Sequence, residues 1–241
     1  MFNDEALAEL SHSRYWDERY RSEQKVNQHE TETQPSLDSY DWFRSFEQLR
    51  RFFEHNLPPS SSGCHILHLG CGNSNLTAEL YALQYTNQTS IDFSDVVIRA
   101  MKSKYSKLGT RWINMDMREL KLPDGSVDVA IDKSTLDVMI HGSSWDPPAD
   151  VQSNVGKYVD EVARVLKPGG RWLYITYRQP HFVRLTLERK DLWDFSVESL
   201  NDSQVMGGFE YFGFIMKKHQ TSHSAQAISQ GESATVQRVA R

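Results

Sequence analysis

The sequence predicts an α/β fold built on a mostly parallel β-sheet with helices on both faces. Three observations predict it. Short apolar runs alternate with segments of helical periodicity, as in successive βαβ units. A Gly-Cys-Gly turn at 70–72 directly follows the first of these runs. Three later runs each lead to an aspartate, Asp92, Asp116 and Asp132, at the edge where open α/β sheets bind ligands.

The N-terminal part is predicted to form a cap segment followed by one helix. Residues 1–39 are polar, apart from the aromatic run at 14–20. From 41 to 56 the apolar residues recur at helical spacing, which predicts an amphipathic helix. The Leu-Pro-Pro-Ser-Ser-Ser-Gly stretch at 57–63 breaks this helix and leads into the first strand.

Strand-like and helix-like runs then alternate through the middle of the chain. The expected strands are 65–70, 88–92, 110–115, 127–132 and 171–177. The expected helices are 74–84, 94–106 and 153–167. Ser153 is the expected N-cap of the last helix, and the Lys-Pro-Gly-Gly sequence at 167–170 its stop signal. Strands separated by helices in this way lie parallel in one sheet.

The C-terminal part has a different pattern. Two β-type runs, 192–200 and 209–218, flank a Gly-Gly turn region, which predicts an antiparallel hairpin. Residues 220–241 are rich in Ser, Gln and Ala and are expected to be disordered. The chain therefore divides into a cap segment with a helix (1–63), a main domain (64–219) and a tail (220–241).

Composition excludes several functional classes. A net charge of −5 without clustered Lys and Arg argues against direct nucleic-acid binding. The two cysteines, Cys64 and Cys71, lack a matching His cluster, so we expect no metal site and no structural disulfide. No apolar run is long enough to span a membrane, and the first ten residues lack a basic signal region. We expect a soluble, cytoplasmic protein without membrane contact.

The glycine turn and the first aspartate indicate a nucleoside-bearing cofactor. Gly72 and Asp92 are 20 residues apart, which places a tight turn beside a carboxylate that can accept ribose hydroxyls. Asn75 stands where a dinucleotide fingerprint has its third glycine, and this disfavours a nicotinamide-dependent oxidoreductase. The plain alternatives are an ordinary strand-to-helix turn and aspartates that only cap helices.

Several segments resemble the ordered motifs of class I S-adenosylmethionine-dependent methyltransferases. These segments are 69–74, 91–94, 115–117, 128–137 and 165–170, within a likeness that spans about 14–219. More narrowly, 15–20, 40–43 and the Lys-Ser-Thr-Leu-Asp element at 133–137 resemble the group that methylates lysine on translation elongation factor 1A. The resemblance implies a Rossmann-like seven-stranded sheet, S-adenosylmethionine as cofactor, and elongation factor 1A as protein substrate.

The resemblance also implies roles for residues near the turn. Gly70 and Gly72 would border the methionine part of the cofactor. Asp92 would take the ribose hydroxyls, and Phe93 would pack beside the adenine. Lys133 would lie near the methionine carboxylate.

Five further residues would complete the cofactor site. Asp116 would accept from the adenine amino group, and Met117 would supply a backbone contact or a lid. Trp16, Tyr20 and Trp42 would close over the site, where an aromatic face suits a sulfonium. Plain packing of the cap on the sheet is the alternative for these three rings.

No catalytic residue is assigned, but two carboxylates are candidates. Asp132 and Asp137 could hold the incoming lysine ammonium at the mouth of the acceptor channel. The chain departs from the family pattern twice in this element. Ser134 stands where glycine is usual, and Asp132 stands where glutamate is more frequent.

Three other functions remain open at the level of sequence. The chain could be a non-catalytic methyltransferase-like adaptor, a methyltransferase of a small molecule, or a nicotinamide-dependent oxidoreductase. Binding of S-adenosylmethionine and transfer of a labelled methyl group separate these functions from protein-lysine methylation.

Overall fold

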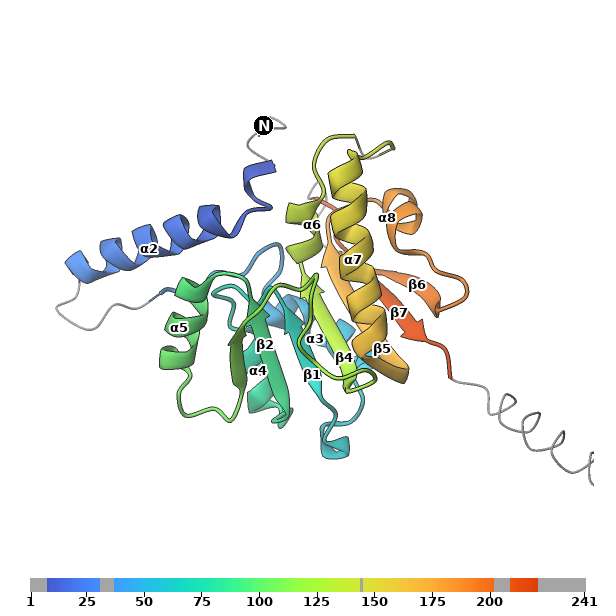
Figure 1. Ribbon diagram of the computed structural model, residues 1–241. Coiled ribbons are helices and arrows are strands. Elements are labelled where there is room, and N and C mark those ends of the chain that lie inside the picture. Colours follow the sequence, from blue (N-terminus) through green and yellow to red (C-terminus); the bar gives the residue numbers. More distant parts are fainter. Residues whose placement is uncertain (1–7, 31–36, 144, 202–208, 221–241) are drawn as a thin grey trace, which may run out of the picture.

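A mixed seven-stranded sheet forms the centre of the protein (Figure 1). The computed structural model describes residues 8–30, 37–143, 145–201 and 209–220. The strands lie in the order β3-β2-β1-β4-β5-β7-β6. Their bounds are β1 (Ile66–Leu69), β2 (Gln88–Asp92), β3 (Arg111–Asn114), β4 (Val127–Lys133), β5 (Leu166–Thr176), β6 (Trp193–Ser199) and β7 (Phe212–Lys218).

Strands β1 to β5 run parallel, and β7 runs antiparallel to both β5 and β6. The order reverses at β1, which pairs with β2 on one side and β4 on the other. At such a switch point the loops at the carboxyl ends of neighbouring strands diverge and leave a crevice for a ligand.

Helices cover both faces of the sheet (Figure 1). They are α2 (Ser13–Glu30), α3 (Phe46–Asn56), α4 (Leu76–Ala82), α5 (Asp95–Lys104), α6 (Thr135–Met139), α7 (Ala149–Val165) and α8 (Pro180–Leu187), with a short 3-10 helix at Ser60–Ser62. Helices α3 and α4 pack on one face, and α6, α7 and α8 pack on the other. Within the described ranges, no helix combines the length and apolar character that crossing a bilayer would require.

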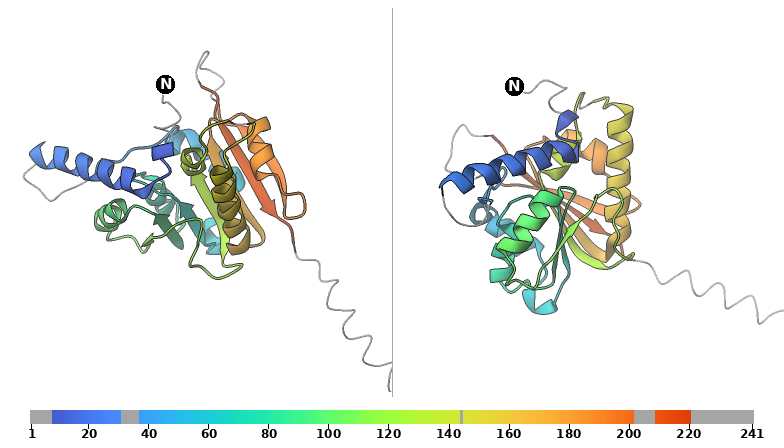
Figure 2. Two further views of the ribbon diagram at one scale, coloured as in Figure 1. Left: turned by 45° about the horizontal axis from the view of Figure 1, so that its top comes forward. Right: turned by 60° about the vertical axis from the view of Figure 1, so that its left-hand side comes forward.

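Helix α2 lies beside α5 and extends past the edge of the sheet (Figure 2). Trp16 and Tyr20 are buried, and they join Val97 and Met101 of α5 and Trp112 of β3 in one apolar cluster. The rest of α2 is mostly polar, so only its first turns are fixed by packing. Those turns place Trp16 and Tyr20 at the carboxyl edge of the sheet.

The predicted α/β fold, with its antiparallel C-terminal strand and helices on both faces, is confirmed. Helices α2, α6 and α8 were not predicted, and the ends of three predicted elements differ. The helix expected at 41–56 begins at Phe46, where Ser45 and Gln48 form a capping box. The helix expected from Ser153 begins at Ala149, after Pro148. The Lys-Pro-Gly-Gly sequence ends that helix but already belongs to β5. Residues 221–241, expected to be disordered, lie outside the described residues.

Candidate active site

The glycine turn connects β1 to α4 and lies against the start of α6. Both glycines adopt the left-handed backbone conformation. Gly70 has φ +62° and Gly72 has φ +50°. A Cβ added at Gly70 would lie 2.3 Å from Cγ2 and 2.4 Å from Oγ1 of Thr135. The Thr135 hydroxyl donates to the carbonyl oxygen of Leu69 at 2.8 Å. The missing side chain of Gly70 therefore makes room for α6, whereas a Cβ at Gly72 would lie 3.1 Å from the Tyr20 hydroxyl.

Asp92 ends β2 directly opposite this turn. Its Oδ2 accepts from the backbone N–H of Gly72 at 3.0 Å, and its Oδ1 accepts from the N–H of Ser94 at 2.9 Å. Each oxygen keeps a second lone pair for a ligand hydroxyl. Burial raises the pKa of Asp92 to about 6. The two N–H donors lower this pKa, and the nearby Asp17 raises it.

A pocket opens between these elements and the cap segment. It encloses about 940 Å³ of space, part of which is open solvent, and its walls are mainly apolar and aromatic. Nine of the ten residues predicted to bind cofactor line it: Trp16, Tyr20, Trp42, Gly70, Gly72, Asp92, Phe93, Met117 and Lys133. The structure thus brings together residues that are far apart in the chain.

The aromatic cap residues form one wall of the pocket. The rings of Trp16 and Trp42 meet edge to face with centroids 6.0 Å apart. The guanidinium of Arg19 lies 5.4 Å from the first ring and 5.3 Å from the second, at cation–π distance. Arg19 is itself paired with Glu23 at 3.0 Å. Helix α2 and the loop at 40–44 are thereby tied to each other beside the pocket.

Lys133 has partners other than the one predicted. Its ammonium donates to Oδ1 of Asp41 at 2.8 Å and to the carbonyl oxygens of Trp42 at 3.2 Å and Arg44 at 3.4 Å. Its side chain is only 7% exposed. Burial lowers the pKa of Lys133, and the hydrogen bond and charge of Asp41 act in the opposite direction. A role at the methionine carboxylate stays a prediction.

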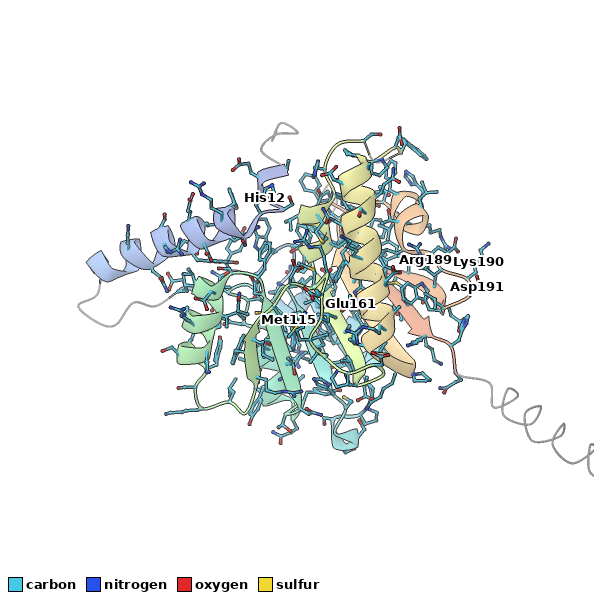
Figure 3. The ribbon with its side chains drawn as sticks, viewed as in Figure 1. His12, Met115, Glu161, Arg189, Lys190 and Asp191 are labelled. Atoms are coloured by element: carbon cyan, nitrogen blue, oxygen red, sulfur yellow. The ribbon has the colours of Figure 1, made fainter. Side chains whose placement is uncertain are left out.

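Asp116 lies outside this pocket, at a neighbouring polar hollow. Figure 3 labels His12 and Met115, which line the same hollow. Oδ2 of Asp116 accepts from Nη2 of Arg118 at 2.6 Å, and its Oδ1 accepts from Nε at 3.0 Å. Burial opposes ionisation, but Arg118 outweighs it and lowers the pKa of Asp116. An adenine amino group would therefore share this carboxylate with Arg118.

The two candidate carboxylates for the acceptor differ in their surroundings. Asp132 is fully buried, and it accepts from the N–H of Thr135 at 2.7 Å and the hydroxyl of Tyr158 at 2.7 Å. Burial raises the pKa of Asp132 to about 7. Both of its oxygens accept from N–H groups at the start of α6, and Asp132 is not among the residues that line the pocket, so its role at the channel mouth stays a prediction.

Asp137 lies in the first turn of α6. Its Oδ1 accepts from the hydroxyl of Thr176 at 2.7 Å and from Nε of Arg178 at 3.0 Å. Its Oδ2 is buried without a hydrogen-bond partner among the described residues. Burial raises the pKa of Asp137 to about 6, against the effect of Arg178. Val138 and Met139, the next residues of α6, line the pocket.

Ser134, which replaces the usual glycine, adopts the backbone conformation that a glycine would favour. Its φ is +72°, in the left-handed region, and it lines the pocket. A serine there stores strain of about 1–2 kcal/mol. The substitution therefore leaves the turn in place at the cost of backbone strain.

The histidines and cysteines near the sheet have structural roles. His65 bonds to Thr89 and to the carbonyl oxygen of Ser126, and His68 bonds to Gln88. Burial lowers the pKa of His68 to about 4, which keeps its ring neutral. Both cysteines are free thiols, and no cluster of three potential metal ligands occurs among the described residues.

A methyltransferase domain family model matches residues 60–229. The chain belongs to this methyltransferase family. EEF1A lysine methyltransferase 4 of Mus musculus is 36% identical over 209 residues, which are 85% of this chain and 74% of that protein. The protein of the same name from Bos taurus is 35% identical over 218 residues, 88% of this chain and 77% of that protein.

Solved structures show the same fold. A protein studied for the conversion of a disulfide bond into a thioacetal group during echinomycin biosynthesis has a TM-score of 0.64, with 14% identity. The match covers 92% of this chain and all of that one. The pocket residues of this methyltransferase fit S-adenosylmethionine as a cofactor. Asp92 offers free lone pairs for ribose hydroxyls, and the apolar walls suit an adenine ring and a sulfonium.

Sequence reasoning missed the partners of the site residues. No motif at Thr135 predicts its contact with Gly70, and no motif at Asp41 predicts its contact with Lys133. The available signals were indirect: Thr135 belongs to the 133–137 element and Asp41 to the 40–43 segment. Contacts across 65 and 92 positions of sequence become visible only in the folded methyltransferase.

Proposed function

We propose that this chain is an S-adenosylmethionine-dependent protein-lysine N-methyltransferase that acts on translation elongation factor 1A. The observation that carries the proposal is the 36% identity to EEF1A lysine methyltransferase 4 of Mus musculus across 85% of the chain. The pocket supports it, because nine predicted cofactor-binding residues line one cavity.

The pocket walls position the cofactor. S-adenosylmethionine, when bound, supplies a methyl group activated by a sulfonium that departs as a neutral thioether. Asp92 receives the ribose hydroxyls on its two oxygens and so fixes the nucleoside. Trp16 and Trp42 exclude water and present aromatic faces, which favour a cationic centre. Catalysis then rests on holding two reactants in line.

The acceptor lysine must be a neutral amine when it attacks the methyl group. A free lysine has a pKa of about 10.4, so the protein has to disfavour its ammonium form. Apolar walls do this by desolvation. We infer that Asp137 rather than Asp132 receives the incoming ammonium. Its Oδ2 has no hydrogen-bond partner among the described residues, whereas both oxygens of Asp132 are engaged.

The test is a methylation assay with labelled S-adenosylmethionine and recombinant elongation factor 1A, followed by mass spectrometry of the product. We expect methyl-lysine on the factor with the wild-type chain. Asp92→Asn should lose the activity through weak cofactor binding. Asp194→Asn is the matched control, because this carboxylate is 81% exposed on β6 and, among the described residues, pairs with His219.

The outcomes separate the remaining functions. Transfer to another protein of a lysate, but not to elongation factor 1A, would refute the substrate and keep the lysine chemistry. Transfer only to small molecules would refute protein methylation. Cofactor binding without any transfer would make the chain an adaptor.

The cellular location belongs to the same proposal. A cytoplasmic location is supported by the two free thiols, because reducing compartments preserve such cysteines. Imaging of a tagged full-length chain tests it, and enrichment in a secretory compartment would refute it.

A further inference from the structure

The loop at 40–44, which we name the strap, is held to the end of β4 by the ammonium group of Lys133. Lys133 donates to Asp41 Oδ1 and to the carbonyl oxygens of Trp42 and Arg44. Three acceptors of one loop thus converge on a cation whose side chain is only 7% exposed. Oδ1 of Asp41 also accepts from the hydroxyl of Ser74 at 2.6 Å, which ties the strap to the glycine turn.

The strap backbone is strained at the point where Lys133 holds it. Phe43 has φ +67°, a conformation that is unfavourable for a residue with a bulky side chain. The N–H of Arg44 donates to the carbonyl oxygen of Trp42 at 2.8 Å, which closes a three-residue turn around Phe43. A γ-turn with positive φ is the rare and strained form, and it persists only when its surroundings impose it.

This turn decides where the aromatic residues of the strap lie. Tyr40 and Trp42 line the cofactor pocket, on one side of the turn. The ring of Phe43 lies 5.2 Å from that of Tyr177, after β5, and 5.6 Å from that of Tyr211, before β7. A relaxed turn would move both groups of rings together.

We propose that Lys133 is a positioning residue that clamps the strap over the cofactor pocket, with Asp41 as its partner, and that it is not the ligand of the cofactor carboxylate. The clamp acts on cofactor binding alone, whatever the methyl acceptor is. A failure of the methylation assay on elongation factor 1A therefore leaves it untouched.

The energetics favour the clamp over the alternative. To reach a cofactor carboxylate, Lys133 would have to release Asp41 and the two carbonyl oxygens. One buried ion pair would then be exchanged for another, and Asp41, only 24% exposed, would be left without its cation. An uncompensated buried charge is costly, and the strained turn at Phe43 would lose its support.

The decisive comparison uses two ligands that differ in the carboxylate. S-adenosylhomocysteine carries the amino-acid end of the cofactor, and methylthioadenosine lacks it. Binding of both ligands to wild type, Lys133→Met and Asp41→Asn is measured by calorimetry. If the clamp holds the pocket wall, Lys133→Met weakens both ligands by the same factor, about tenfold when the closed strap falls to about a tenth of the population. Asp41→Asn weakens both in the same direction, by less.

A carboxylate ligand would behave in the opposite way. Lys133→Met would then weaken S-adenosylhomocysteine alone, and Asp41→Asn would leave its binding unchanged or tighter, because it frees the ammonium. Either result overturns the clamp, as does unchanged binding of both ligands to both variants.

A second readout needs no ligand. Hydrogen exchange at the amide of Arg44, which closes the strained turn, should accelerate in Lys133→Met and in Asp41→Asn. Unchanged protection there refutes the clamp, even if the binding data are ambiguous. Lys167→Met is the matched control, because Lys167 pairs with Asp128 at 2.7 Å away from the pocket and should leave both readouts as in wild type. If Lys133→Met does not fold, Asp41→Asn decides alone. Weaker binding of both ligands supports the clamp, and unchanged or tighter binding of S-adenosylhomocysteine overturns it.

Discussion

Substitution of Gly70 by alanine tests the structural reason for the glycine turn. The new Cβ would meet Cγ2 of Thr135 at 2.3 Å and Oγ1 at 2.4 Å, far inside contact distance. The left-handed φ of +62° costs about 1–2 kcal/mol for any L-residue, and overpacking of this kind costs about 1–3 kcal/mol. We expect Gly70→Ala to lower the free energy of unfolding by about 2–5 kcal/mol.

A double-mutant cycle separates the two contributions. Thr135→Ala removes the two closest atoms and leaves a contact of 2.9 Å with its Cβ. In that background Gly70→Ala should cost less, about 1–2 kcal/mol of backbone strain plus a smaller steric cost at the remaining 2.9 Å contact. Urea denaturation followed by circular dichroism measures all four proteins. Additivity within about 0.5 kcal/mol would show that Thr135 does not demand the glycine, and the steric reasoning would be wrong.

Four further outcomes are expected. The affinity for S-adenosylhomocysteine should fall up to tenfold per pH unit below about pH 6, because only the ionised Asp92 carboxylate accepts both ribose hydroxyls. Calorimetry measures this affinity, and Asp92→Asn should show weak, pH-independent binding. Tyr158→Phe should destabilise the fold by about 1.5–3 kcal/mol in urea, since it removes a buried donor to Asp132. Ser134→Gly should raise stability by up to about 1 kcal/mol in the same assay through relief of its positive φ. Gly213→Ala should lower the melting temperature, because its Cβ would meet the Phe52 ring at 2.4 Å.

The parallel part of the fold could be predicted because its signals are local. The strand that ends at Lys133 is buried along most of its length and is rich in Val, Ala and Ile, so its composition marks it. Helix α2 was not predicted, because between residues 13 and 25, where burial is described, only Trp16 and Tyr20 are buried among many polar residues. The extension of β5 back to Leu166 was missed since its Pro-Gly-Gly sequence has the composition of a turn.

In the candidate site, the positions of residues at strand ends could be predicted, whereas the contacts made by a loop could not. Residues set by the strands, such as Gly72 and Asp92, reach the pocket as predicted. Lys133 also reaches it, but its partner Asp41 comes from a loop whose path depends on the strained turn at Phe43. No periodicity encodes such a path. Asp132 was expected at the channel mouth, yet a carboxylate at a strand end can equally cap the following helix, as it does for α6.

The place of β7 in the sheet sets an order of events during synthesis on the ribosome. β7 is the last strand along the chain, but it lies between β5 and β6. The 35 residues between Thr176 and Phe212 take about 2–7 s to synthesise at ~5–20 residues per second. For those seconds one edge of β5, with Trp172 and Tyr174 in its centre, has no partner strand. A pause of translation in this interval would leave a nascent intermediate that is prone to aggregate, and a chaperone would have to protect this edge of β5.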